Sequence, residues 1–313
     1  MRAKILITDP IHPKAVEMLK SEGFEVVQET KMTSKELIRN IVHYDALIVR
    51  SATIVTKEII EAGKNRLKVI GRAGVGLDNI DVNTAKKYDI KVVRSPKGSS
   101  VSVAELIMGL ILGLSRSIPA GNHGLKEDKW IKKQIKGREL RGKILGIIGC
   151  GNVGIELAKR ALAFEMNVLG CDVVDSAVQN AEELGCTCVP LDEIVKNSDI
   201  ITLCCPLNDK TRKMINKDII DLMKPTAYLI NTARGEIVEE NALYEALKNG
   251  RIAGAALDVF LNEPNPDPKL VKLPNVIATP HIGAQTKEAN QAVSTILVEK
   301  IIKILKGKRL DKE

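Results

Sequence analysis

The length, composition and charge of the chain exclude several classes of protein. Its 313 residues exceed what one small core organises and fit two domains of ordinary size. Apolar residues make up 44% and charged residues 27%, which excludes a disordered chain. The most apolar stretch, 103–114, contains Glu105 and is shorter than the roughly 20 residues that a bilayer requires. We therefore expect a globular protein with no membrane segment.

The net charge of +8 and the six cysteines narrow the possible partners. Lysines are spread along the chain and aromatic residues are only 3% of it, so we expect no nucleic-acid surface but an attraction for small anions. The cysteines form no C-x-x-C pair and have no histidine nearby, so we expect no metal site. Reduced thiols in a cytoplasmic protein are the better interpretation of positions 150, 171, 186, 188, 204 and 205.

Strand-like and helix-like patterns alternate through the first hundred residues. Runs rich in Ile and Val predict strands at 4–9, 24–29, 45–51, 67–74 and 90–95. Amphipathic stretches stand between these runs, which indicates a parallel sheet covered by helices. A long helix is expected next, with Ser100 or Ser102 as its N-cap and Pro119 at its end.

A second alternation begins near residue 143 and predicts a second α/β unit. Its expected strands lie at 143–149, 166–172, 199–206, 227–233, 254–259 and 276–280. The final stretch, 286–307, has apolar residues at helical spacing and is expected to return to the first unit. The domain boundary would then be crossed twice, near residues 97 and 283.

A glycine-rich turn, Gly149–Gly154, opens the second unit between a predicted strand and a predicted helix. Gly149 permits the tight turn, Gly151 lets the backbone approach a pyrophosphate, and Gly154 lets helix and strand pack closely. Asp172 ends the next strand, where a carboxylate binds the ribose hydroxyls and repels a 2′-phosphate. The alternative is a structural turn beside a solvated acid. The combined spacing predicts NAD as the cofactor.

Three later strands each lead into a polar residue of catalytic type. Arg234 follows one strand, Asp258 and Glu263 follow the next, and His281 follows the last. Because ligands bind beyond the carboxyl ends of parallel strands, we expect these side chains to converge. Oxidation of a 2-hydroxy acid needs a base, a cation for the carboxylate and a hydride acceptor. Taken singly, the same residues could be a surface arginine, a solvated acid or a structural histidine.

Five segments in this order, GCGNVG, Asp172, NTARGEIV, ALDVFLNEP and TPHIGA, resemble the D-isomer-specific 2-hydroxyacid dehydrogenases. The likeness extends over about residues 45–290. It implies an α/β fold with two doubly wound parallel-sheet domains. One is a flavodoxin-like substrate domain of residues 1–96 and 283–313, and the other is a Rossmann NAD-binding domain of residues 97–282.

The resemblance also implies roles for single residues. Arg234 is similar to the family's arginine for the substrate carboxylate, His281 to its acid/base, and Glu263 to the partner that raises the basicity of that histidine. Asp258 is similar to the group that holds the nicotinamide amide. Contacts with NAD are also implied for Val75, Gly149, Gly151, Asn152, Val153, Gly154, Asp172, Cys205, Pro206, Thr232, Ala233, Arg234, His281, Gly283 and Ala284. Cys205 stands where the family often has threonine, and a thiol is a poorer donor.

Two strand ends of the first domain bear on the substrate. Arg50 with Ser51, and Arg72 with Ala73 and Gly74, each pair a cation with small residues whose backbone N–H groups can approach an anion. Since Arg234 already serves one carboxylate, these arginines indicate a second anionic group such as a phosphate. The alternative is an internal ion pair of one arginine, for example with Asp45 or Asp78.

The expected substrate follows from three further segments, VRSAT, GRAGVGLDNID and AELIMGLILGLSR. Within the family they are most similar to the members that act on D-3-phosphoglycerate. The resemblance therefore implies oxidation of this acid to 3-phosphohydroxypyruvate, the entry step of serine synthesis, in a form without a C-terminal regulatory domain. A glyoxylate or hydroxypyruvate reductase remains open, as does a non-catalytic NAD-sensing protein, because the fold also serves as a binding module.

A homodimer is implied by the resemblance alone. Lys132 follows Trp130 in the stretch that forms the dimer contact in the resembled enzymes. From there its ammonium group would reach the neighbouring subunit's substrate. A solvated surface run is the alternative.

Overall fold

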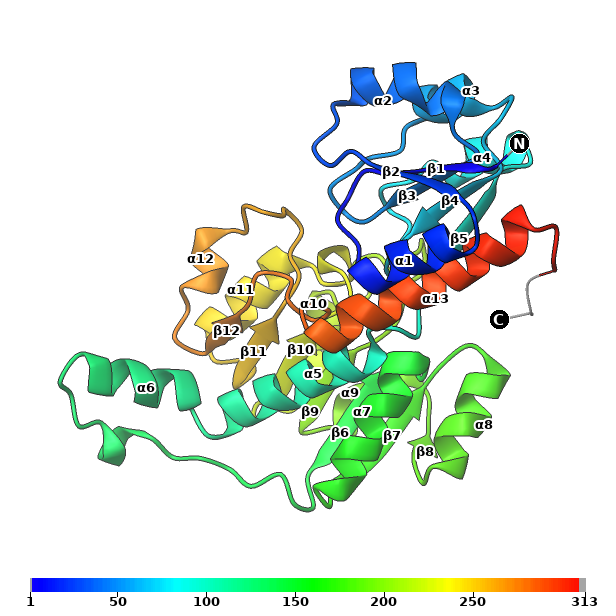
Figure 1. Cartoon of the computed structure of the whole chain (residues 1–313). Coiled ribbons are helices and arrows are strands. Elements are labelled where there is room, and N and C mark those ends of the chain that lie inside the picture. Colours follow the sequence, from blue (N-terminus) through cyan, green and yellow to red (C-terminus); the bar gives the residue numbers. More distant parts are fainter. Residues whose placement is uncertain (1, 310–313) are drawn as a thin grey trace. The chain divides into compact units, whose positions relative to one another are not determined.

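The computed structural model describes residues 2–309, which form two compact units (Figure 1). One unit combines residues 2–99 with 285–309, and the other is Ser100–Ala284. Each has a single sheet whose described strands are all parallel, with helices on both faces, as the sequence predicted.

The first unit has the strand order β2-β1-β3-β4-β5 among its described residues, which is the flavodoxin-like order. The order reverses between β1 and β3, so this is the switch point of the sheet. Its elements are β1 (Lys4–Ile7), α1 (Pro13–Ser21), β2 (Glu25–Gln28), α2 (Ser34–Asn40), η1 (Ile41–His43), β3 (Ala46–Val49), α3 (Lys57–Gly63), β4 (Val69–Arg72), α4 (Val82–Lys87), β5 (Lys91–Arg94) and α13 (Lys287–Leu305).

Successive side chains of each strand enter opposite layers of this unit, because a strand has a period of two. Ile5 and Ile7 pack in the layer that contains α1 and α13, whereas Leu6 packs in the layer that contains α2 and α3. Both faces are therefore covered, which explains why the central strand β3 is apolar at every position, whereas the edge strands β2 and β5 begin and end in polar residues. The C-terminal helix α13 contacts β4, β5 and α1 of this unit.

The second unit has the strand order β12-β11-β10-β9-β6-β7-β8, with its switch point between β6 and β9. Its elements are α5 (Ser100–Ser115), α6 (Ile118–Lys126), η2 (Lys132–Gln134), β6 (Ile144–Ile148), α7 (Asn152–Ala163), β7 (Asn167–Cys171), α8 (Asp175–Glu183), β8 (Thr187–Cys188), α9 (Leu191–Asn197), β9 (Ile200–Leu203), α10 (Lys217–Leu222), β10 (Tyr228–Asn231), η3 (Gly235–Ile237), α11 (Glu240–Lys248), β11 (Gly254–Leu257), α12 (Pro268–Val271) and β12 (Val276–Ala278).

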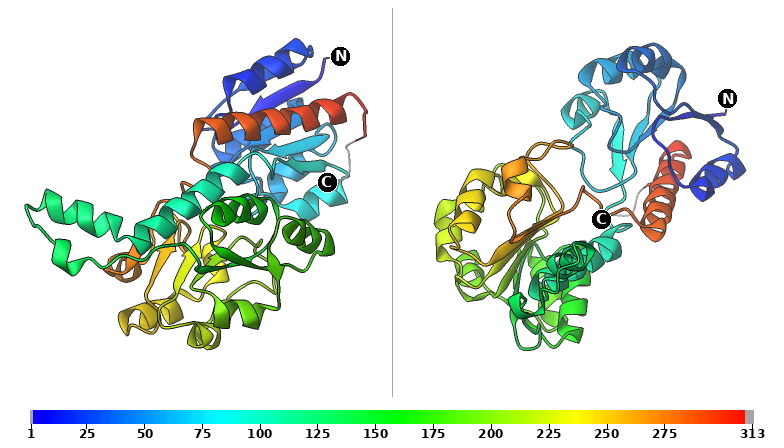
Figure 2. Two further views of the ribbon diagram at one scale, coloured as in Figure 1. Left: turned by 90° about the horizontal axis from the view of Figure 1, so that it is seen from below. Right: turned by 90° about the vertical axis from the view of Figure 1, so that its left-hand side faces the viewer.

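Two apolar layers also enclose the second sheet. Helices α5 and α7 pack against Leu145 and Ile147 on one face. Helices α9, α10 and α11 pack against Ile201 and Leu203 on the other. The two views in Figure 2 show this sheet between its helices. The carboxyl ends of its strands are thus held at one rigid edge.

The long helix after residue 99 differs from its expected course. Helix α5 begins at Ser100, so Ser102 lies inside the first turn, and it ends at Ser115 rather than at Pro119. Ser117 has a left-handed φ of 49°, and α6 begins directly after it with Pro119 in its first turn. Proline is tolerated there because the first N–H groups of a helix have no intrahelical acceptor. The proline therefore starts a new helix instead of ending the old one.

No single helix of the described residues is long and apolar enough to cross a membrane. Helices α5 and α6 are long and apolar enough only as a pair, and this pair is bent by 65°. Much of α5 is buried within the second unit, with Ala104, Ile107 and Ile111 fully covered.

Candidate active site

The glycine turn joins β6 to α7 at the switch point of the second sheet. Gly149 has a φ of 103°, a left-handed value that favours glycine. A Cβ on Gly154 would collide with the carbonyl oxygen of Gly149, so the helix approaches the turn more closely than any side chain allows. At Gly151, by contrast, a Cβ would meet no atom within 4 Å. The turn is thus compact on its inner side and open on its outer side.

The start of α7 presents backbone donors at this open side. The N–H groups of Asn152, Val153 and Gly154 find no acceptor among residues 2–309, and the N-cap residue, Gly151, supplies no side-chain oxygen. A helix N-terminus also carries a partial positive charge. Free donors, positive potential and open space fit the pyrophosphate of a dinucleotide.

Asp172 lies beside this turn, directly after β7. Its Oδ2 accepts a 2.7 Å hydrogen bond from the Cys150 N–H, and its Oδ1 accepts a 3.0 Å bond from the Val174 N–H. A carboxylate has about four acceptor positions, so capacity remains for ribose hydroxyls. The acid is therefore fixed in place by the turn itself.

Several thiols surround the same turn, and burial controls their chemistry. Burial raises the pKa of Cys150 to about 12, of Cys204 to about 12 and of Cys205 to about 11. These thiols are protonated at neutral pH and are poor nucleophiles. All six cysteines are free, and no group of three His, Cys, Asp or Glu side chains within residues 2–309 is placed to hold a metal ion.

A histidine and a carboxylate meet beyond the carboxyl ends of β11 and β12. The His281 Nδ1 and Glu263 Oε2 atoms are 2.7 Å apart, and the side chains are 50% and 37% exposed. The second carboxylate oxygen of Glu263 accepts from the Phe260 N–H at 3.1 Å, which fixes its direction. A carboxylate on Nδ1 orients the ring and leaves Nε2 for proton exchange with a substrate.

The loop that carries His281 is held by the buried Asp258. The Asp258 carboxylate accepts from the Thr279 hydroxyl at 2.6 Å, the Ile282 N–H at 2.8 Å and the Gly283 N–H at 2.8 Å. The His281 N–H donates to the Asp258 carbonyl, and this histidine has a left-handed φ of 53°. Asp258 therefore sets the conformation of the acid/base candidate, a role that sequence reasoning missed. The expected contact of Asp258 with the nicotinamide amide stays a prediction.

Arg234 lies in a turn after β10 that a buried asparagine closes. The Asn231 Oδ1 accepts from the Ala233 N–H at 3.0 Å, and its Nδ2 donates to the Arg234 carbonyl at 2.9 Å. The half-buried guanidinium of Arg234 donates to the Ala233 carbonyl at 2.7 Å. Asn231 was not anticipated, although a polar residue at the buried end of an apolar strand is a usable signal.

These polar segments form one continuous structure within the second unit. Gly235, next to Arg234, packs so closely on the Phe260 carbonyl that a Cβ would collide with it. The Phe260 N–H in turn binds Glu263, which binds His281. A series of direct contacts thus connects the arginine turn to the histidine, as the expected convergence at one sheet edge requires.

The first unit contains the arginines that were expected to bind substrate. Arg50 follows β3, and Arg72 ends the neighbouring strand β4. The Arg50 Nη1 lies 3.3 Å from the Asn290 Oδ1. Asp45, a suggested ion-pair partner for these arginines, is bound by Arg66 at 3.1 Å and by Lys68 at 3.7 Å.

One expectation at these strand ends is wrong in part. The Ala73 N–H donates to the Val49 carbonyl at 2.8 Å, and the Gly74 N–H donates to the Ser95 hydroxyl at 3.2 Å. The first donor is occupied because β4 continues its pairing with β3 beyond Arg72, and the second is occupied by a side chain that follows β5. They are not available to an anion in this conformation.

Lys132 lies in the exposed η2 segment after α6, close in sequence to Trp130, whose side chain is 79% exposed. Helix α6 and η2 extend away from the sheet of the second unit (Figure 1). The contact of Lys132 with a neighbouring subunit, the homodimer and the cytoplasmic location all stay predictions.

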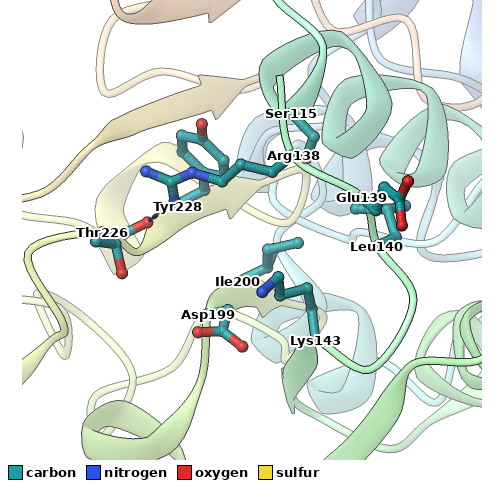
Figure 3. A pocket seen from close by; sticks show the side chains of 9 residues that line it. All are labelled: Ser115, Arg138, Glu139, Leu140, Lys143, Asp199, Ile200, Thr226 and Tyr228. Atoms are coloured by element: carbon teal, nitrogen blue, oxygen red, sulfur yellow. Dashed lines mark hydrogen bonds between the residues drawn. The ribbon is translucent and has the colours of Figure 1, made fainter. Parts of the chain in front are cut away.

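A separate pocket of about 250 Å³ lies at the opposite edge of the second sheet (Figure 3). Lys143, Asp199 and Thr226, which line it, all precede strands. Arg138 donates to the Thr226 carbonyl at 2.6 Å and lies over the Tyr228 ring. Because catalytic candidates follow strands and these residues precede them, the pocket is distinct from the candidate site.

Comparison with known proteins is consistent with this geometry. Residues 108–283 match the family described as D-isomer specific 2-hydroxyacid dehydrogenase, NAD binding domain. The chain is 50% identical over 306 residues to a D-3-phosphoglycerate dehydrogenase of Methanocaldococcus jannaschii, covering 97% of this chain and 58% of that protein. It is 48% identical over 308 residues to a hydroxypyruvate reductase of Thermotoga maritima, covering 97% of this chain and 99% of that protein.

A solved structure shows the same fold with ligands present. It is the D-lactate dehydrogenase of Aquifex aeolicus complexed with NAD and lactic acid, with a TM-score of 0.84 and 31% identity over 97% of this chain and 96% of that chain. The present chain thus spans little more than half of the phosphoglycerate dehydrogenase that it matches, and nearly all of the other two relatives. The chain belongs to the D-isomer-specific 2-hydroxyacid dehydrogenase family, and Ser100–Ala284 contains the NAD-binding domain of that family.

Proposed function

We propose that this protein is an NAD-dependent dehydrogenase that oxidises D-3-phosphoglycerate to 3-phosphohydroxypyruvate. The observation that carries the dehydrogenase assignment is the His281–Glu263 pair, joined by direct contacts to the Arg234 turn in an NAD-binding domain. The residues of the first unit and the phosphoglycerate dehydrogenase relatives support the choice of substrate.

The chemistry assigns one task to each side chain. The Arg234 guanidinium binds the substrate carboxylate through two parallel hydrogen bonds, which lysine cannot form. The His281 Nε2 accepts the proton of the hydroxyl group, and the Glu263 carboxylate stabilises the imidazolium that results. NAD, when bound, supplies the acceptor for the hydride that leaves the carbon bearing this hydroxyl group. In the reverse direction His281 returns the proton.

The phosphate group is the feature that separates the candidate substrates. Arg50 follows β3, Arg72 is the last residue of the neighbouring strand β4, and the charges of both suit a second anionic group of the substrate. A second candidate function, reduction of hydroxypyruvate, is favoured by the Thermotoga maritima relative, which this chain covers over 99% of its length.

The deciding experiment measures NADH formation from D-3-phosphoglycerate and D-glycerate, and NADH consumption with hydroxypyruvate and glyoxylate. We expect the highest kcat/KM with the phosphorylated acid. Arg72→Ala should raise its KM by about 10- to 100-fold, the worth of a lost charge-assisted hydrogen bond, with little change for D-glycerate. Faster turnover of hydroxypyruvate would establish the second function instead. NAD binding without turnover of any acid would establish a non-catalytic protein.

Asp172 is expected to determine the choice between NAD and NADP. Asp172→Asn removes the charge that repels a 2′-phosphate and keeps part of the hydrogen bonding to the turn, so the ratio of the NADP Kd to the NAD Kd should fall at least about 10-fold. Fluorescence titration with both reduced cofactors measures this ratio. Asp175→Asn, which changes an exposed acid in the first turn of α8, is the control and should leave the ratio unchanged. An unchanged ratio in both variants would remove Asp172 from cofactor selection.

A further inference from the structure

At the switch point of the first sheet lies a loop whose two ends are fixed by hydrogen bonds to side chains from other segments. Strands β1 and β3 are neighbours there, with Ile7 opposite Ile48. Asp9 follows β1 and the loop 50–53 follows β3, so both lie at the carboxyl edge of the sheet. In open α/β sheets, the crevice at such a point is where ligands bind.

Asp9 binds both ends of this loop from one side. Its Oδ2 accepts from the Arg50 N–H at 2.6 Å and from the Thr53 N–H at 3.1 Å, and its Oδ1 accepts from the Thr53 hydroxyl at 2.9 Å. The Asp9 residue is only 5% exposed. Burying a carboxylate is costly unless donors surround it, and within residues 2–309 the three donors that Asp9 binds all belong to the loop.

Asn79 binds the same two loop residues from their carbonyl side. Its Nδ2 donates to the Arg50 carbonyl at 2.7 Å and to the Thr53 carbonyl at 2.7 Å. The N–H groups of Arg50 and Thr53 are thus held by one side chain and their carbonyls by another. Asp9 and Asn79 come from different segments, so the loop is clamped by tertiary structure and not by its own turn.

The middle of the loop carries backbone donors that Asp9 and Asn79 do not occupy. Ser51 and Ala52 are exposed, and within residues 2–309 neither backbone N–H makes a hydrogen bond. Two adjacent N–H groups with small side chains suit an anionic oxygen. Because the loop ends are already fixed, binding costs little further ordering of the backbone.

We propose that Asp9 and Asn79 are positioning residues that hold the Ser51 and Ala52 N–H groups, and the Arg50 backbone, in the arrangement that receives the substrate's anionic group. The proposal rests on the function proposed above. Asp9 and Asn79 act through the loop and do not touch the substrate.

Conservative and disruptive variants of Asp9 separate positioning from charge. In Asp9→Asn the amide oxygen can still accept from the two loop N–H groups. The amide NH₂ can donate to the Thr53 hydroxyl, whose own proton can then be donated to the Thr8 hydroxyl, 2.9 Å away. Asp9→Ala removes every bond. We expect Asp9→Ala to raise the KM for D-3-phosphoglycerate about 10- to 100-fold, while kcat and the NAD Kd stay within about threefold of wild type. The KM of Asp9→Asn should be much closer to the wild-type value than to that of Asp9→Ala.

Asn79 gives an independent test in which the substitution adds a negative charge instead of removing one. Asn79→Asp places carboxylate oxygens against the Arg50 and Thr53 carbonyls, and should raise the KM at least as much as Asn79→Ala. Equal KM values for wild type and both variants would overturn the proposal.

Asp45 supplies a matched control in the same unit. This buried acid also binds a backbone N–H, that of Lys4 at 2.9 Å, but it precedes β3 and so lies at the amino edge of the sheet. Asp45→Ala should lower the Tm and leave the KM unchanged. If Asp45→Ala raised the KM as much as Asp9→Ala, the effect would be a general loss of structure and the proposal would fail.

A second readout keeps this proposal distinct from the proposed function. Inorganic phosphate is titrated into the enzyme while the amide NMR signals of Ser51 and Ala52 are followed. Both signals should shift in the wild type and in Asp9→Asn, and the response should be lost in Asp9→Ala. Absence of a shift in the wild type would overturn the inference, even if the acids are turned over. A shift without turnover of any acid would support the loop assignment and refute the dehydrogenase function.

Discussion

Replacing His281 by alanine is expected to lower kcat by about 10²- to 10⁴-fold, the usual contribution of a positioned acid/base. The reason is that the imidazole, held on Glu263 through Nδ1, is the acid/base candidate of this loop and has half of its surface exposed. The NAD Kd should change by less than about threefold, because the dinucleotide contacts proposed for the α7 N-terminus and Asp172 lie elsewhere in the unit. Steady-state kinetics with D-3-phosphoglycerate and a cofactor titration measure both quantities.

The matched control for this variant is His43→Ala. His43 is an exposed histidine in η1, in the other unit, and its loss should change neither kcat nor the NAD Kd. Glu263→Gln should fall between wild type and His281→Ala, because the ring keeps a hydrogen-bond partner but the imidazolium loses its carboxylate. A His281→Ala enzyme with near-normal kcat would refute the proposed mechanism.

Replacing Gly235 by alanine is expected to have the second largest effect, lowering both activity and stability. A Cβ at this position would collide with the Phe260 carbonyl group and with the Leu261 nitrogen, which are backbone atoms that cannot rotate away. The Arg234 turn and the Glu263 loop must then separate. We expect a loss of about 1–3 kcal/mol in the free energy of unfolding, typical of overpacking, and a fall of more than about 100-fold in kcat/KM, since small misplacements of catalytic groups are costly.

Gly109→Ala is the control, because no close contact requires glycine at this position. Gly109 lies inside α5, where a Cβ would meet no atom within 4 Å. Alanine should therefore stabilise the helix by about 0.5–1 kcal/mol and leave kcat/KM unchanged. Denaturant unfolding and steady-state kinetics decide both cases. Equal behaviour of the two variants would show that the contact between the two loops does not hold the site together.

The arrangement of strands and helices follows largely from local patterns. Ile- and Val-rich runs such as 4–9 and 45–51 became buried strands, because strands covered on both faces are apolar at every position. The glycine turn was equally readable, since its spacing reflects close approach and left-handed backbone that other residues resist.

Local patterns were less accurate where tertiary contacts override them. The two-residue strand β8 was not anticipated, because its sequence has no clear apolar signal. It forms because it pairs with β7. In α13 the residues Val293, Leu297, Val298 and Ile301 are buried, whereas the neighbouring apolar residues Ala292 and Ile296 are only half-buried. The sheet beneath α13 selects which of two adjacent apolar stripes is covered.

The two α/β units, the glycine turn and the chemical types of Arg234, Glu263 and His281 can be predicted from the sequence, because each depends on periodicity or on residues close along the chain. Which atoms meet is known only from the folded chain: Glu263 with His281, Gly235 with Phe260, and Asp9 with the loop after β3. The physical reason is that such pairs depend on strand order and on hydrogen bonds between segments up to tens of residues apart. A buried polar group takes whatever partner the packed fold brings to it, and the local sequence does not contain that information.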